Sequence, residues 1–123
     1  MIAGIGIDIV EIERIRGLIE RYGSRFIDRV FSPSEISYCR NKKDPSENFA
    51  ARFAVKEAFV KALGTGMIQG MKFNDVSLEF TERPEIKLSG AAESIAKTKG
   101  IASMHASISH EKGYAIAIVI LEV

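Results

Sequence analysis

Hydrophobic and polar positions follow two different periods along this chain, and each change of period marks a predicted element. Between Ile2 and Val10, Ile5, Ile7 and Ile9 alternate with Gly4, Gly6 and Asp8, which predicts a strand with two unlike faces. Glycine weakens a strand unless something must approach its backbone closely. Two interpretations stay open: a lane cleared for a ligand and ending in the Asp8 carboxylate, or a helix packed tightly on the glycines with Asp8 capping the next helix.

A helical period follows this strand. The predicted helices run to Gly23, over Ser24 to Phe31, from Ser32 to near Asn41, and from Asp44 to Leu63, with Gly64 as the stop. Ser32-Pro-Ser-Glu35 and Asp44-Pro-Ser-Glu47 each combine a capping residue, a first-turn proline and an acid at the third position. This combination is typical of helix starts.

The second half of the chain returns to the strand period. We expect a glycine-rich loop from Gly64 to Gly70 and then a hairpin of Val76 to Phe80 with Ile86 and Leu88. A helix from Ser89 to Gly100 follows. The chain should end in a second hairpin, in which a strand from Ile101 to Ser109 turns at Glu111–Gly113 into a strand from Tyr114 to Val123. The last strand is apolar on both faces, which places it centrally or at a subunit contact. The order predicts one compact α+β domain over residues 1–123: an antiparallel or mixed sheet packed by the long helix and the short N-terminal helices.

The long helix carries charges inside its apolar pattern. Glu57 and Lys61 lie one turn apart at the edge of the apolar stripe, beside the small side chain of Ala54. Lys56 projects from the middle of that stripe, where a charge rarely stays without a partner or a ligand. An ordinary surface ion pair of Glu57 with Lys61, and a Lys56 that extends its ammonium to water, would explain the same pattern.

Composition narrows the class of protein. Of the 123 residues 46% are hydrophobic and 27% charged, which is ordinary for a soluble globular domain. The net charge of +1 supplies no general field for nucleic acid or a membrane, so neither is expected as a partner. The single cysteine, Cys39, excludes an internal disulfide framework. We see no signal peptide, and the longest apolar run, Ala115 to Leu121, is too short to span a bilayer, so we expect a cytoplasmic protein.

Two carboxylates from distant segments are the first candidate site. If Asp8 and Glu57 converge, they form a hard-oxygen site without a thiol. Such a site suits Mg²⁺, which takes one or two carboxylates and completes its shell with water and substrate phosphate. Lys56 and Lys61 beside the ion would then be phosphate ligands. Taken singly, each of these residues is a weak signal, because any globular protein offers acids and lysines.

Two histidines and a glycine loop are further candidates. His105 shares one strand face with Ser107 and Ser109, and His110 begins the hairpin turn. Each histidine is either an ordinary half-buried residue or a functional one, as phosphate donor or proton carrier. The Gly64-Thr65-Gly66 loop could approach a bulky ligand with its backbone. Its spacing differs from the Walker A motif, and it follows a helix rather than opening one.

A basic, partly apolar face lies on the first two helices. It contains Arg14, Leu18, Arg21, Tyr22, Arg25, Phe26 and Arg29. The face is either simply solvated or a docking patch for an acidic partner, in which arginines steer the encounter and apolar neighbours anchor it.

Three segments together resemble a known family. They are Gly4-Ile-Gly-Ile-Asp8 with the residues up to Arg14, then Phe53-Ala-Val-Lys-Glu-Ala-Phe-Val-Lys61-Ala-Leu-Gly64, then His105-Ala-Ser-Ile-Ser-His110. In this order and at this length the chain, from residue 2 to its end, resembles holo-[acyl-carrier-protein] synthase, the small bacterial type of 4′-phosphopantetheinyl transferase. Phe53 stands where the family has Trp or Phe, so the motif is intact.

The resemblance implies a reaction and a set of roles. The 4′-phosphopantetheine of coenzyme A would move to a serine of apo acyl carrier protein, in fatty acid biosynthesis. Asp8 and Glu57 would hold Mg²⁺, and Glu57, Lys61 and His105 would be catalytic. Lys56, Gly64, Thr65, Ser109 and His110 would bind coenzyme A. Arg14, Leu18, Arg21, Arg25 and Phe26 would dock the carrier, and the assembly would be a homotrimer with sites between subunits.

Some alternatives remain open at the level of sequence. The general base could be Glu57, His105, His110 or a metal-bound water. A non-catalytic module that binds coenzyme A or another nucleotide would use the same lysines and glycine loop. In a plain interaction domain, Lys56 would reach water and Asp8 would cap a helix.

Overall fold

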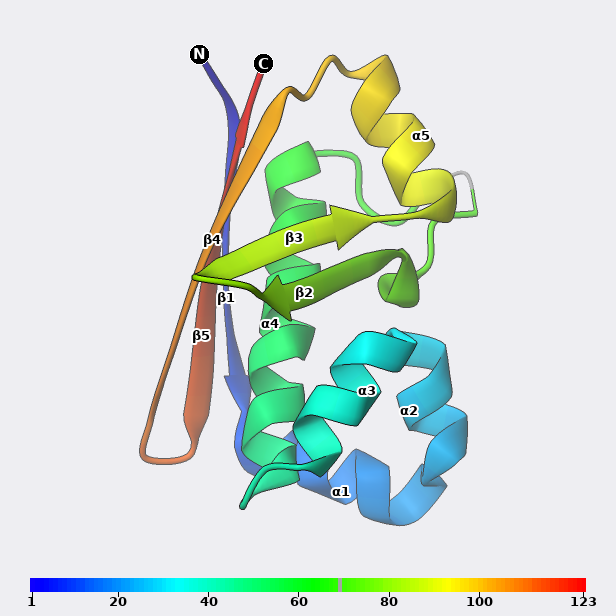
Figure 1. The fold of residues 1–123 in the computed structure, drawn as a ribbon, viewed down its shortest axis with the longest axis vertical. Coiled ribbons are helices and arrows are strands. Elements are labelled where there is room, and N and C mark those ends of the chain that lie inside the picture. Colours follow the sequence, from blue (N-terminus) through cyan, green and yellow to red (C-terminus); the bar gives the residue numbers. More distant parts are fainter. Residues whose placement is uncertain (69) are drawn as a thin grey trace.

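The computed structural model describes residues 1–68 and 70–123. Its elements, in chain order, are β1 (Ile2–Glu11), α1 (Ile12–Tyr22), α2 (Ser24–Val30), α3 (Pro33–Arg40), α4 (Pro45–Leu63), the 3₁₀ turn η1 (Phe73–Asp75), β2 (Val76–Phe80), β3 (Pro84–Leu88), α5 (Gly90–Thr98), β4 (Ser103–Glu111) and β5 (Tyr114–Glu122) (Figure 1). The predicted α+β class is confirmed. The predicted loop from Gly64 to Gly70 is described except for Gln69, which lies outside the described residues.

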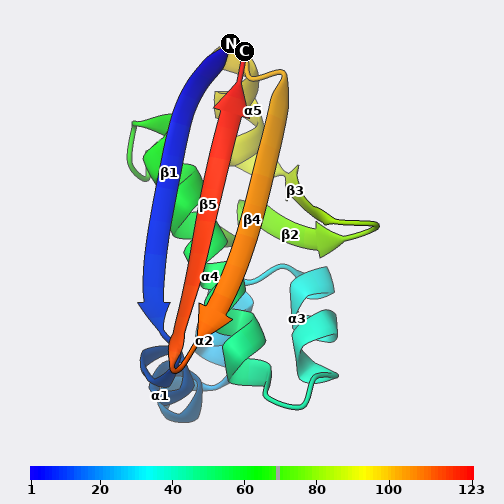
Figure 2. The ribbon, with the colours of Figure 1, turned by 90° about the vertical axis from the view of Figure 1, so that its left-hand side faces the viewer.

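One antiparallel sheet has the strand order β1-β5-β4, so the strand that is apolar on both faces is central, which is one of the two placements predicted for it. Its inward residues Ala115, Ala117, Val119 and Leu121 are buried, and α4 covers this face. The opposite face looks toward the viewer in Figure 2. Ile5, Ile7 and Ile9 of β1 stand on it with 56 to 60% of their surface exposed. The sheet therefore has one packed face and one open apolar face.

The two glycines of β1 bring that strand unusually close to α4. A Cβ on Gly4 would lie 1.9 Å from the carbonyl oxygen of Ala62, and one on Gly6 would lie 1.8 Å from that of Ala58. Only glycine permits this approach of two backbones. Packing of a helix on the glycines is therefore confirmed, whereas the capping part of that interpretation is wrong: Glu11 occupies the N-cap of α1.

Local signals placed most of the helix ends correctly. At α3 the predicted capping box forms: the Ser32 side chain accepts from the Glu35 amide, and the Glu35 carboxylate accepts from the Ser32 amide at 3.0 Å. Gly64 ends α4 in the left-handed conformation, with φ 78°. The strand β4 begins at Ser103 rather than at Ile101, because the Ile101 amide donates to Ala96 at the end of α5.

The short helices α1, α2 and α3 gather at one end of α4, and the β2–β3 hairpin crosses it near its middle (Figure 1). At the α1 end, Arg16 joins the layers by donating to both carboxylate oxygens of Asp44, which precedes α4. Across residues 1–68 and 70–123, no helix combines the length and the apolar character that crossing a membrane requires.

Candidate functional site

A cluster of charged side chains lies where β1 meets α4. Lys61 Nζ donates to Asp8 Oδ1 at 3.0 Å and to the carbonyl oxygen of Ile7 at 3.0 Å. Asp8 follows Gly6 by two residues, so it points from the same strand face toward α4. The close glycine contact thus carries the Asp8 carboxylate to the helix surface that bears Glu57 and Lys61.

The charges of this cluster act on Glu57. Partial burial raises the pKa of Glu57 above its usual range, and the neighbouring Asp8 carboxylate raises it further. The Lys61 ammonium and the Arg14 guanidinium act in the opposite direction. The structure therefore brings Asp8 to Glu57 and Lys61, from which it is far apart in the sequence, and adds Arg14 to them.

The raised pKa predicts how the metal-free protein responds to pH. Because the pKa of Glu57 is higher in the folded state than its ordinary 4.5, ionisation of this carboxyl opposes folding. The contribution of protonated Glu57 to the free energy of unfolding is complete below pH 4.5. It is lost as the pH rises through the pKa that Glu57 has in the folded state. With a chelator present, the Tm of the wild type should therefore fall relative to that of Glu57→Gln between pH 4.5 and 7. Parallel Tm–pH curves for the two proteins would contradict this.

The donor set of the cluster fits a hard divalent cation. Two carboxylates, Asp8 and Glu57, repel each other when both are ionised, and a divalent ion removes that conflict. In the described part of the chain, histidine, cysteine and acidic side chains form no group of three that could hold a metal. A metal at Asp8 and Glu57 would therefore take its remaining ligands from water and substrate, as Mg²⁺ does.

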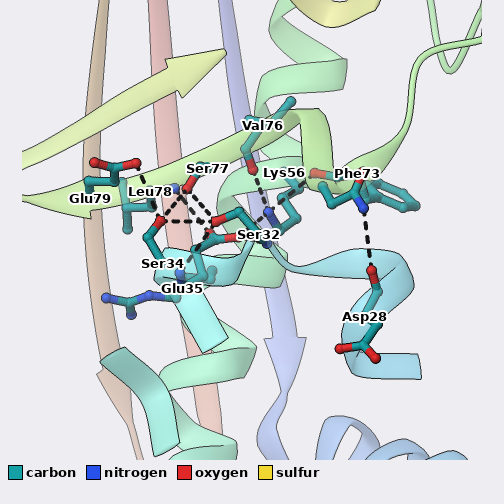
Figure 3. Close-up of polar contacts among 12 residues, drawn as sticks. Asp28, Ser32, Ser34, Glu35, Lys56, Phe73, Val76, Ser77, Leu78 and Glu79 are labelled. Atoms are coloured by element: carbon teal, nitrogen blue, oxygen red, sulfur yellow. Dashed lines mark hydrogen bonds and ion pairs between the residues drawn. The ribbon is translucent and has the colours of Figure 1, made fainter. Parts of the chain in front are cut away.

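Lys56 is not part of this cluster, and its predicted role as a phosphate ligand is wrong. Its ammonium is fully buried and donates to Glu35 Oε1 at 2.6 Å, to the Phe73 carbonyl at 3.2 Å, and to the Val76 carbonyl (Figure 3). Burial lowers the pKa of Lys56, and the Glu35 carboxylate opposes that shift. The sequence pattern correctly required a partner for this charge, but the partner is a protein carboxylate and not a ligand.

His105 and Ser109 lie on the other side of the sheet from Asp8. Directly paired residues share a face, and His105 pairs with Ile120, whereas Asp8 pairs with Ala117 on the α4 side. His105 Nε2 lies 2.5 Å from Glu122 Oε1, and this hydrogen bond holds the pKa of that carboxyl below its usual range. Within one chain the structure does not bring His105 or Ser109 to the carboxylate cluster.

The other predicted coenzyme-binding residues lie at the two ends of α4. His110 Nε2 is 3.3 Å from Glu47 Oε1 in the first turn, which is about 15 Å along the helix axis from Glu57. Gly64 and Thr65 lie past the last turn, and Thr65 Oγ1 donates to the Gly66 carbonyl at 3.0 Å. Gly64 and Thr65 therefore adjoin the Lys61 end of the cluster, whereas His110 does not.

The basic face of α1 and α2 contains a groove of about 240 Å³. Its lining comprises Leu18, Tyr22, Arg25, Phe26, Arg29 and Val30. Arg14 is not among these residues; its guanidinium lies 5.8 Å from the centre of the Phe53 ring and acts on Glu57. Of the predicted docking residues, Leu18, Arg25 and Phe26 share the groove, and Arg21 stacks on Tyr22 at 5.3 Å.

A second cleft was missed by sequence reasoning. It has a volume of about 370 Å³ and lies between β3 and β4, where Arg83 and Pro84 face His105. The Arg83-Pro84 pair lies between the two predicted strands of the hairpin, Val76 to Phe80 and Ile86 with Leu88, and the sequence pattern assigned it no function. The distance of 22 residues between Arg83 and His105 conceals that the two strands adjoin.

Comparison with known proteins defines the class to which this fold and site belong. Residues 4–119 match the family model described as the 4′-phosphopantetheinyl transferase superfamily, and the chain belongs to that family. It is therefore a transferase, and the resemblance predicted from its motifs is confirmed.

Particular relatives carry a more specific name. The chain is 45% identical to holo-[acyl-carrier-protein] synthase of Halothermothrix orenii, over 99% of this chain and 98% of the relative, and 48% identical to that of Koribacter versatilis, over 99% of each. The structure superposes on the Neisseria meningitidis synthase with a TM-score of 0.92 at 34% identity, covering all of both chains. The Helicobacter pylori synthase in complex with coenzyme A gives 0.84 at 40% identity, over 96% of this chain and 99% of that one.

Proposed function

We propose that this chain transfers the 4′-phosphopantetheine group of coenzyme A to a serine hydroxyl of apo acyl carrier protein, in fatty acid biosynthesis in the cytoplasm. The products are holo carrier protein and adenosine 3′,5′-bisphosphate. The convergence of Asp8, Glu57 and Lys61 carries this proposal, because it gathers the groups that a diphosphate substrate needs. The names of the full-length relatives support the choice of coenzyme A and carrier.

The reaction asks the protein mainly for positioning and for neutralisation of charge. Asp8 and Glu57 would hold Mg²⁺, which when bound neutralises negative charge on the diphosphate. Lys61, with 54% of its side chain exposed, exchanges its bond to Asp8 for one to a phosphate oxygen. The serine oxygen of the carrier forms the new bond to phosphorus as the bond from phosphorus to the leaving adenosine bisphosphate breaks, and the hydroxyl proton is released to solvent. The nucleophile belongs to the carrier, so this chain needs none of its own.

We further propose a homotrimer in which each site lies between two copies. The open face of the sheet exposes Ile5, Ile7 and Ile9 of β1, and apolar patches of this kind mark contacts between proteins. His105 and Ser109 share that face. A second copy seated on it would bring the cleft of Arg83 and His105 to the carboxylate cluster of its neighbour, which one chain alone does not do.

A charge on the open face should dissociate the assembly. Ile7→Glu places a carboxylate among exposed isoleucines while leaving the packed face of β1 unchanged. Light scattering should give about three times 13.6 kDa for the wild type and about 13.6 kDa for the variant, which should also lose transferase activity. Lys99→Glu, an exposed change beyond this face, serves as the control. A variant that stays at the wild-type mass would contradict the proposed interface.

Carrier docking is assigned to the groove of α1 and α2. Arg21→Glu with Arg25→Glu should raise the KM for the carrier by about tenfold and leave the affinity for coenzyme A unchanged, because rim charges steer an acidic partner. Arg14 is excluded from this test because its charge acts on the pKa of Glu57. Arg40→Glu with Lys43→Glu makes the same change of net charge elsewhere and should have little effect. An equal rise of KM in both double variants would remove the docking assignment.

Mass spectrometry of an apo carrier tests the function itself. After incubation with coenzyme A, Mg²⁺ and this protein, the carrier should gain the mass of one phosphopantetheine group. A chelator should prevent the gain and added Mg²⁺ should restore it. Calorimetric binding of coenzyme A without any gain of carrier mass would instead indicate a non-catalytic binding module.

A further inference from the structure

The helix that carries Glu57 and Lys61 is held by two contacts on opposite sides. On one side Gly4 and Gly6 touch the carbonyls of Ala62 and Ala58. On the other side the ammonium of Lys56 is fixed to Glu35 and to the segment that leads into β2 (Figure 3). At about 100° per residue, Ala58 lies about 160° around the helix from Lys56, so the two contacts face away from each other.

The second contact joins three elements through two fully buried charges. Glu35 Oε1 accepts from the Ser32 amide at 3.0 Å and from Lys56 at 2.6 Å, and its Oε2 accepts from the Leu78 amide at 3.0 Å. Both side chains have 0% of their surface exposed. The pair therefore ties α4 to the start of α3 and to β2.

Stability alone does not account for such a pair. The free-energy cost of removing two charges from water offsets much of their mutual attraction. Apolar side chains of similar volume often stabilise a fold equally well. An ion pair with directed hydrogen bonds differs from apolar packing in one respect: it fixes one geometry. Lys56 has three acceptors and Glu35 has three donors, so rotating α4 would break several directed bonds at once.

We propose that the buried Lys56–Glu35 pair is a positioning device for Glu57 and Lys61. Glu57 and Lys61 lie about 100° and 140° around α4 from Lys56, on the flank between its two contacts. A rotation of the helix would swing this flank past Asp8, which belongs to β1 and does not move with α4. The pair thereby sets the separation of the Asp8 and Glu57 carboxylates. That separation matters for activity when the two carboxylates hold a metal, so this inference rests on the proposed metal-assisted transfer.

The double variant Lys56→Met with Glu35→Gln tests this role. It removes both charges and keeps one acceptor oxygen at residue 35, which can accept from the amide of Ser32 or from that of Leu78 but not from both. We expect kcat to fall by about 10- to 100-fold, as for other residues that orient metal ligands. The Kd for coenzyme A with Mg²⁺, measured by calorimetry, should rise, while the KM for the carrier stays unchanged. A mere loss of folded protein would lower kcat alone.

Ile95→Ala is the matched control. Ile95 is buried in α5 and does not belong to the ion pair, so this variant should lower the Tm and leave kcat per folded molecule and the Kd for coenzyme A unchanged. If the double variant does not fold, Lys56→Arg is measured in the same way, because it keeps the charge and alters its geometry.

Three results would overturn the proposal. The first is a wild-type kcat and a wild-type Kd for coenzyme A in the Lys56 variant that folds, and the second is an equal loss of kcat and of coenzyme A affinity in Ile95→Ala. The third is failure of both Lys56 variants to fold, which would assign the pair to the fold alone. If the wild type itself transfers nothing to the carrier, the proposed function fails. The calorimetric comparison then still decides whether the pair shapes the coenzyme site.

Discussion

Replacing Glu57 by glutamine should lower kcat for transfer by about 10²- to 10³-fold, the range found when one preorganised charge-stabilising group is removed. Glutamine keeps the shape of the side chain and removes the charge that would hold Mg²⁺ beside Asp8. The Tm of the metal-free variant should equal or exceed that of the wild type, because ionised Glu57 is partly buried next to a second carboxylate. The measurements are carrier mass shift under single-turnover conditions and thermal unfolding with a chelator.

Glu93→Gln is the matched control for this experiment. Glu93 is an exposed carboxylate in the first turn of α5, away from the cluster. Its replacement should leave kcat unchanged. Transfer at the wild-type rate by Glu57→Gln would remove Glu57 from the proposed site, and the metal assignment would fall with it.

Gly6→Ala should produce the largest loss of stability. The new Cβ would meet the Ala58 carbonyl at 1.8 Å, and both atoms belong to backbones that are fixed by a sheet and by a helix. Forcing α4 away from β1 should cost about 3 kcal/mol or more, as overpacking in a well-packed core does. In thermal unfolding at a fixed protein concentration this corresponds to a Tm lower by roughly 10 °C. Transfer should fall as well, because Asp8 and Glu57 move apart.

Gly17→Ala offers the opposite outcome within the same chain. Gly17 lies inside α1, where a Cβ would have nothing within 4 Å among the described residues. Alanine is favoured over glycine in a helix interior by about 0.5–1 kcal/mol, so the Tm should rise slightly. A wild-type Tm for Gly6→Ala would show that α4 can yield at this contact, and the close-packing explanation of the glycines would be wrong.

Local patterns predicted the elements well because their causes are local. The capping box of Ser32 and Glu35 and the left-handed Gly64 act within a few residues, and both were placed from the sequence. The central position of β5 was one of the two placements that its apolar faces predicted. The first residue of β4 was predicted wrongly as Ile101, because the Ile101 amide donates to the Ala96 carbonyl at the end of α5 and not to a neighbouring strand.

The candidate site was predicted in part. The sequence indicated that Asp8, Glu57 and Lys61 could meet, and they do. It placed Lys56 with them because a periodic pattern shows that a charge is buried but not what it contacts. Glu35, its partner, had been interpreted only as a capping residue, and it serves in both roles at once.

The resemblance to a family came from the motifs that contain Asp8, Glu57 and His105. The order of apolar, glycine and capping residues alone determined the class of fold and the long charged helix. Those properties depend on neighbours within a turn or along a strand. Only the tertiary structure decided which charges share a site. That choice depends on contacts between segments more than 20 residues apart: Gly6 with Ala58, Lys56 with Glu35, and Lys61 with Asp8. The tertiary structure also placed His105 on the side of the sheet opposite to Asp8, because strand pairing, and not sequence distance, sets the face of a side chain.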